Sequence, residues 1–156
     1  MTNAIGVTFD GSIPLPGQTL QPTGHDPLVI TTHEDLDKFI AALIEDYGTH
    51  AAYARVLDPQ VGNADEYPAQ SLSFAVNQDG KVGGLKYYEE ATIWYALGSP
   101  ATDEVEYVFF GNSTPWPTDS RIPLNQVKAA VNHFREHSGA RWGGVEWKAW
   151  PEEIPV

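Results

Sequence analysis

The chain has 156 residues, of which 42% are hydrophobic and 12% aromatic, so it is long and apolar enough to bury the core of one domain. Its formal net charge of −12 disfavours direct binding to nucleic acid or to anionic lipid, because both are polyanions. It has no cysteine, which excludes disulfides and thiolate metal sites, and no apolar run long enough to span a bilayer. We therefore expect a single cytoplasmic domain over residues 1–156 that contacts neither membrane nor nucleic acid directly.

The N-terminal half begins irregularly and then forms a helix. Residues 11–27 mix prolines with glycines, which predicts an extended Pro/Gly-rich arm. The next segment is predicted to be a helix over residues 32–47, because Thr32 and Asp35 resemble a capping box and Gly48 is a natural terminator. Its apolar residues recur at helical spacing and form one stripe: Leu36, Phe39, Ile40, Leu43, Ile44 and Tyr47.

The middle of the chain has the two-residue period of strands. We expect strands over residues 51–57, 72–76, 81–88, 92–97 and 104–110. Asp79-Gly80 predicts a tight hairpin between the second and the third of these strands. Gly83-Gly84 indicates a bulge or a close backbone approach. Because the connections are short, the strands are expected to form an antiparallel meander.

The C-terminal part is predicted to add a second helix. A loop is expected over residues 111–122, with Pro123 as the first helical residue. The apolar stripe of this helix is Val127, Ala130, Val131 and Phe134. Gly139 ends it, and a last strand is expected over residues 144–148. Two helices against one antiparallel sheet predict an α+β sandwich of two layers.

Aromatic residues mixed with acids are the strongest sign of a binding surface. We expect the helices to cover one sheet face, which carries Phe74, Ile93, Tyr95, Val105 and Tyr107. The opposite face would then carry Trp94, Val108 and Phe110 near Glu104 and Glu106, a composition typical of protein-binding hot spots. Two alternatives stay open: another segment covers this face, or Trp116 plugs the core. The candidate binding residues are Tyr88, Glu89, Glu90, Trp94, Glu104, Glu106, Phe110, Trp116 and Asp119.

One motif has catalytic form. His133-Phe134-Arg135-Glu136-His137 matches the H-x-x-E-H pattern of zinc peptidases, in which two histidines share the metal and the glutamate acts as base. A third protein ligand from a distant downstream segment is needed, and only the short C-terminal stretch follows. A small zinc hydrolase is thus the alternative function. Another is a small-ligand module with a cleft between Asp65 and Trp116. Our leading interpretation has no catalytic residue and no cofactor.

The C-terminal half resembles a known family. The motifs that carry the resemblance are Gly83-Gly84-Leu85, Trp94, Tyr107-Val108-Phe109-Phe110-Gly111, Pro115-Trp116-Pro117, Ile122-Pro123, Phe134, Ser138-Gly139-Ala140-Arg141 and Val145-Glu146-Trp147. In order and spacing, over residues 70–148, they resemble the first-numbered (Imm1-like) family of immunity proteins in bacterial polymorphic toxin systems. The stretch from the second helix to Trp147 is the most telling part.

The resemblance implies an antidote that binds and inhibits a cognate secreted toxin. Members of this family are often paired with toxins that attack nucleic acid, such as deaminases and nucleases. The acidic charge agrees, since a toxin that grips nucleic acid offers a basic active-site region that an acidic, aromatic surface can occlude. We therefore expect the partner to be a toxin with a basic surface.

Overall fold

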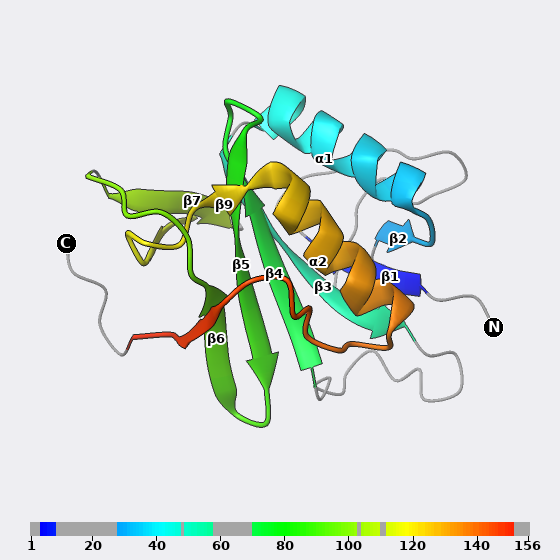
Figure 1. The fold of residues 1–156 in the computed structure, drawn as a ribbon. Helices are drawn as coiled ribbons and strands as arrows, with labels where there is room; N and C mark the ends of the chain where they lie inside the picture. Colours follow the sequence, from blue (N-terminus) through cyan, green and yellow to red (C-terminus); the bar gives the residue numbers. More distant parts are fainter. Residues whose placement is uncertain are drawn as a thin grey trace.

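The architecture is an almost entirely antiparallel sheet with two helices on one face, which confirms the predicted α+β class (Figure 1). The computed structural model describes residues 4–8, 28–47, 49–57, 70–102, 104–109 and 112–151, so the predicted arm at 11–27 lies outside it. The helices are α1 (His33–Tyr47) and α2 (Leu124–Glu136). The strands are β1 (Ala4–Thr8), β2 (Leu28–Ile30), β3 (His50–Leu57), β4 (Gln70–Val76), β5 (Val82–Glu89), β6 (Thr92–Ala96), β7 (Val105–Phe109), β8 (Asn112–Trp116), β9 (Ile122–Pro123) and β10 (Trp147–Ala149).

The strand order is β10-β6-β5-β4-β3-β1-β2. Strands β3 to β6 are neighbours in chain order, as the predicted meander requires. Extending the meander to β7 was wrong, because β7 pairs with β8 and meets β3 through one parallel bridge between His50 and Val108. The chain after β6 is instead held beside the segment that follows β8, where the Gly98 N–H donates to the Asp119 carbonyl at 2.7 Å. The edge of β6 that does not face β5 pairs with β10.

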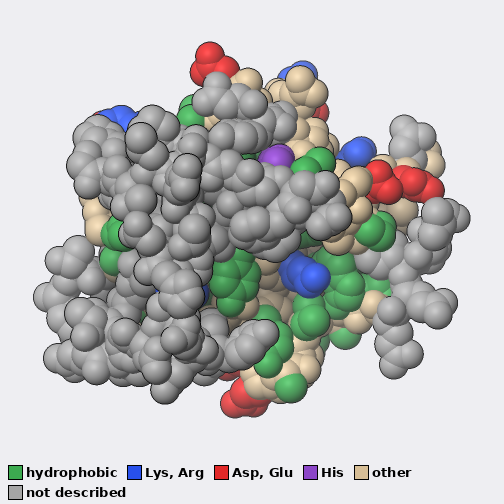
Figure 2. Space-filling model, turned by 180° about the vertical axis from the view of Figure 1, so that it is seen from behind, with side chains coloured by type: hydrophobic (Ala, Val, Ile, Leu, Met, Phe, Trp, Pro, Cys, Tyr) green, Lys and Arg blue, Asp and Glu red, His purple; other side chains and the backbone are tan. Residues whose placement is uncertain are grey.

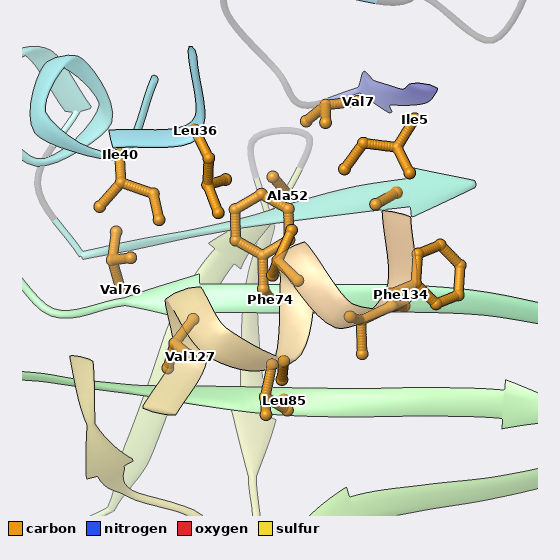
Figure 3. Close-up of a cluster of buried hydrophobic side chains, with 14 of the residues drawn as sticks. Ile5, Val7, Leu36, Ile40, Ala52, Phe74, Val76, Leu85, Val127 and Phe134 are labelled. Carbon is orange, nitrogen blue, oxygen red and sulfur yellow. The ribbon is translucent and has the colours of Figure 1, made fainter. Parts of the chain in front are cut away.

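The main core lies between the helices and the sheet (Figure 3). Helix α1 begins as predicted, since the Asp35 N–H donates to Thr32 Oγ1 at 3.0 Å. Its stripe packs onto the strands, and the rings of Phe39 and Phe74 meet edge to face at 6.0 Å. Helix α2 starts at Leu124, one residue after its predicted start, because Pro123 still pairs with Val82 in the sheet. Each large apolar side chain buried here stabilises the fold by about 1.5–3 kcal/mol.

The β4–β5 hairpin confirms the turn signal at Asp79-Gly80. Asp79 Oδ1 accepts the Lys81 N–H at 2.9 Å, and Gly80 has a φ of 70°. The register then runs unbroken from Val76↔Gly83 to Gln70↔Glu89, so Gly83-Gly84 forms no bulge. The other expectation, close approach, is confirmed, because a Cβ on Gly83 would lie 2.1 Å from the Ala75 carbonyl oxygen.

A second, smaller core lies on the opposite face of the sheet. It consists of Ala51, Ala75, Val105, Tyr107 and Trp116, with Trp150 packed against it. The predicted loop over 111–122 was wrong, because β8 forms a hairpin with β7 that carries Trp116 onto this face. Pro115 is tolerated in β8 since this strand pairs with β7 alone in the described sheet.

The two cores correct the predicted assignment of sheet faces. Trp94 pairs with Tyr87 and packs against the main core, so it lies on the helix-covered face. Ile93 and Tyr95 alternate with Trp94 and therefore lie on the opposite face. Val105 and Tyr107 belong to the second core. The residues that the alternation grouped within β6 and β7 do share a face. That face is turned away from the helices, because the second core on the other side of the sheet also buries aromatic residues.

Figure 2 views the face of the sheet turned away from the helices, where hydrophobic side chains gather beside basic ones. Lys86 lies over the ring of Trp150, with Nζ 4.1 Å from the ring centroid. Burial lowers the pKa of Lys86. The rings of Trp150 and Tyr95 meet edge to face at 6.0 Å. In the part of the chain that the structure describes, no helix is long and apolar enough to cross a membrane.

Candidate functional site

The turn between β5 and β6 holds two residues in the left-handed region. Glu90 has a φ of 50° and Ala91 a φ of 64°, where hairpins usually carry Asn-Gly. Glu89 and Glu90 project at this end of the sheet, and Glu90 is exposed. The Tyr87 hydroxyl lies 2.9 Å from Glu89 Oε2 and 2.8 Å from the Gly139 carbonyl oxygen. Burial, followed by the hydrogen bond and charge of Glu89, raises the pKa of Tyr87.

The segment after α2 crosses the same end of the sheet. The helix ends with the Gly139 N–H donating to the Phe134 carbonyl at 2.8 Å, and Gly139 has a φ of 92°, which favours glycine. The chain then runs across the helix-covered face to reach β10 beside β6 (Figure 1). Tyr87 fixes this crossing through its contact with the Gly139 carbonyl. As a result, Arg141 lies over Trp94 of β6, and Trp142 packs against the main core.

Tryptophans and one arginine form a stacked group here. The Arg141 guanidinium carbon is 5.3 Å from the ring centroid of Trp94 and 5.6 Å from that of Trp147. The Trp147 indole N–H donates to the Trp142 carbonyl at 2.7 Å. All three tryptophans are half-buried and Arg141 is exposed. We call this set, with the two acids of the β5–β6 turn, the tryptophan–arginine surface; it comprises Glu89, Glu90, Trp94, Arg141, Trp142 and Trp147.

This surface has the composition of a binding hot spot. Trp and Arg are the residues most enriched at such sites, and the stacked geometry orders them before a partner arrives. The tryptophans rest on the main core, so their exposed edges are rigid. Glu89 and Glu90 add negative charge at the adjoining β5–β6 turn, where Glu89 meets the Tyr87 hydroxyl. The arrangement suits a partner that offers apolar groups flanked by basic ones.

The structure brings only part of the predicted site together. Glu89, Glu90 and Trp94 lie on the tryptophan–arginine surface, while Tyr88 is half-buried on the other sheet face, paired with Ile93. Phe110 lies outside the described residues. Arg141, Trp142 and Trp147 were missed as site residues. Their signal was present in the sequence, because they fall in or beside the motif stretch that most resembles the immunity family.

The other predicted residues lie elsewhere. Glu104 and Glu106 are exposed, the first just before β7 and the second within it. The β7–β8 hairpin meets β3 at the opposite end of the sheet from the β5–β6 turn. Ser113 Oγ donates to Glu106 at 3.0 Å. Asp119 accepts the Tyr95 hydroxyl at 2.7 Å. Trp116 is 3% exposed and belongs to the second core, so it fills that core and is not an exposed binding residue. Of the proposed small-ligand cleft, Asp65 lies outside the described residues.

A groove of about 450 Å³ is lined by residues of α2, by two residues of α1 and by Trp142. His33 Nε2 lies 2.7 Å from Glu136 Oε1, and Lys128 Nζ lies 3.2 Å from Asp37 Oδ1. We call this the interhelical groove; it is lined by His33, Asp37, Asn125, Lys128, Ala129, Asn132, His133, Glu136, His137 and Trp142.

The H-x-x-E-H motif lies along this groove. The rings of His133 and His137 stack with centroids 4.2 Å apart. Burial, then the nearby charge of His137, lowers the pKa of His133, whereas the hydrogen bond from His33 lowers that of Glu136. Within the described ranges, no group of three or more His, Asp and Glu side chains is arranged to hold a metal ion. The structure therefore adds nothing to the zinc hydrolase alternative.

An open sheet that exposes tryptophans and an arginine within an acidic rim is typical of a protein that binds another protein. The sequence matches the family described as Immunity protein Imm1 over residues 24–149, which is most of the chain. The chain therefore belongs to the Imm1 family of immunity proteins, as its motifs indicated, and its role is immunity against a toxin. No match is found among curated proteins.

Proposed function

We propose that this immunity protein neutralises its toxin by binding it directly through the tryptophan–arginine surface, without any catalytic step. The observation that carries the proposal is the position of exposed Arg141 over the rings of both Trp94 and Trp147, near Glu89 and Glu90 of the β5–β6 turn. Such a group supplies rigid apolar area at little entropic cost, which is what a binding anchor requires.

The toxin that fits this surface is one that acts on nucleic acid, such as a deaminase or a nuclease. Its active-site region has to be basic to hold a polyanion, and the net charge of −12 on this chain attracts a basic protein. Binding there would occlude the toxin's active site. Glu104 and Glu106, at the other end of the sheet, would contribute to long-range attraction rather than to contact. A cytoplasmic location follows from this role, since a nucleic-acid toxin acts inside the cell.

The proposal is tested by expressing the toxin encoded beside this gene with and without the immunity protein. Wild type is expected to protect the cells. Arg141→Ala should weaken the complex by about 30-fold, because truncating a hot-spot residue costs about 2 kcal/mol or more. Binding is measured by calorimetry on the purified pair.

Lys81→Ala is the matched control, because Lys81 is an exposed basic residue at the opposite end of β5. It should bind the toxin as tightly as wild type. An Arg141→Ala variant that folds and binds like wild type would move the interface away from this surface. A wild-type protein that gives no protection and no binding would end the proposal altogether.

A further inference from the structure

The interhelical groove has carboxylate acceptors and two stacked imidazole rings among its lining residues. Asp37 and Glu136 supply carboxylates. His133 and His137 present stacked rings, and burial lowers the pKa of His133, which favours its uncharged form. Trp142 also lines the groove. A planar cation that lies along these rings while its N–H groups meet a carboxylate would use both features.

Each of the two carboxylates has one side chain that is at least partly exposed among its partners. His33, which contacts Glu136, has a side chain 66% exposed, so its hydrogen bond competes with water and contributes little. Lys128, opposite Asp37, is likewise partly exposed at 34%. Arg135 stays near Glu136 at 3.7 Å and is anchored by donating to the Thr31 carbonyl at 2.8 Å. An incoming cation therefore competes with two side chains that are at least partly exposed, His33 at Glu136 and Lys128 at Asp37.

One buried acceptor of the groove is unsatisfied. Asn132 is 8% exposed and lines the groove, yet its Oδ1 has no hydrogen-bond partner. An unpaired buried acceptor costs about 1–3 kcal/mol. A donor that enters the groove and draws the Asn132 carboxamide towards it would recover part of this cost. An entering donor reaches this oxygen only after the Asn132 side chain turns, because the atom has almost no exposed surface.

We propose that the interhelical groove receives an arginine side chain of the toxin, an inference that rests on the proposed function. Arginine fits better than lysine, because a flat guanidinium stacks on the imidazoles of His133 and His137 and pairs with the Glu136 carboxylate through two N–H groups. The groove adjoins the tryptophan–arginine surface at Trp142, so one partner can cover both. The acidic chain already selects a partner rich in such side chains.

The first test needs no toxin. The full chain is titrated with N-acetyl-L-arginine methylamide while the ring resonances of His133 and His137 are followed by NMR. We expect saturable shifts that Glu136→Gln abolishes and Glu45→Gln keeps, since Glu45 is an exposed acid of α1 that does not line the groove. Absence of saturable shifts overturns the proposal, as do equal shifts with the corresponding lysine amide.

The second test uses the toxin encoded by the neighbouring gene. Glu136→Gln should lower the affinity by about tenfold or more, because it removes a hydrogen bond to a charged group. Glu45→Gln should stay within about twofold, and His33→Ala should not weaken binding. If wild type binds the toxin but Glu136→Gln binds equally well, the groove inference fails and the proposed function stands. If wild type does not bind at all, the proposed function fails, and the first test alone decides whether the groove takes a guanidinium.

Discussion

At the scale of single residues, the second core depends on a missing side chain. A Cβ on Gly84 would lie 2.9 Å from Trp116 Cζ3 and 3.3 Å from the Ser120 carbonyl oxygen. Gly84→Ala should therefore destabilise the protein by about 1–3 kcal/mol through overpacking, as measured by urea unfolding. Gly143→Ala is the matched control, because its Cβ meets nothing within 4 Å, and it should be near neutral. Equal stability of the two variants would contradict this packing.

The same contact explains why residue roles were hard to read from sequence. Trp94 and Trp116 both stand between apolar neighbours in the sequence, yet Trp94 is half-buried and Trp116 is 3% exposed. Burial of Trp116 depends on Gly84, which is distant in the chain and leaves space for its ring. Exposure of Trp94 depends on how the segment after α2 crosses β6. Neither condition is local in the sequence, so residue type alone could not distinguish the exposed tryptophan from the buried one.

At the scale of elements, local signals were reliable where one segment decides the outcome. The capping residues of α1 and the Asp79-Gly80 turn fix their own structures, and both were predicted. Which face a strand turns to the helices is decided by pairing with its neighbours. Alternation correctly grouped Ile93 with Tyr95, but the pairing of Tyr87 with Trp94 places that group away from the helices. Sequence periodicity contains no information on this choice when both faces bury aromatic residues.

The β5–β6 turn is expected to store strain. Ala91 has a φ of 64°, a region that costs an L-residue with a Cβ roughly 1 kcal/mol. Ala91→Gly should therefore raise the free energy of unfolding by about 0.5–1 kcal/mol. The reverse change in the other hairpin, Gly80→Ala at a φ of 70°, should lower it by a similar amount. Thermal unfolding of both variants checks the pair, and a loss of stability in Ala91→Gly would show that the turn is unstrained.

The link between β7 and the β4–β5 hairpin should be sensitive to high pH. The Tyr107 hydroxyl donates to Asn77 Oδ1 at 2.7 Å, and burial raises the pKa of Tyr107 from 10.0 to about 12. Because the folded-state pKa lies above the unfolded one, the stabilisation is complete below about pH 10 and is lost as the pH rises to about 12. Tyr107→Phe should lose stability less steeply across this window, although it starts about 1 kcal/mol lower without its hydrogen bond. Urea unfolding at about pH 8 and about pH 11 measures both slopes, and equal slopes would exclude Tyr107 as the source.

At the scale of the whole molecule, charge and contact act at different steps of binding. The net charge of −12 acts over distance, whereas the tryptophan–arginine surface acts after contact. The sequence could indicate the long-range attraction, because net charge is a sum over residues and does not depend on which residues are in contact. It could not place the tryptophan–arginine surface, since Trp94, Arg141 and Trp147 come together only through the crossing segment and β10.

This separation gives a kinetic prediction for the complex with the toxin. The association rate constant should fall by about tenfold or more between about 0.05 and 0.5 M salt, because the Debye length shortens from roughly 14 Å to about 4 Å.

Glu104→Gln combined with Glu106→Gln, at exposed positions away from the proposed contact, should slow association and leave dissociation unchanged. Arg141→Ala should do the reverse and speed dissociation. Stopped-flow association and surface-plasmon dissociation measure the two constants. Faster dissociation in the double variant would place Glu104 and Glu106 in the contact itself and shift the interface towards the β7–β8 hairpin.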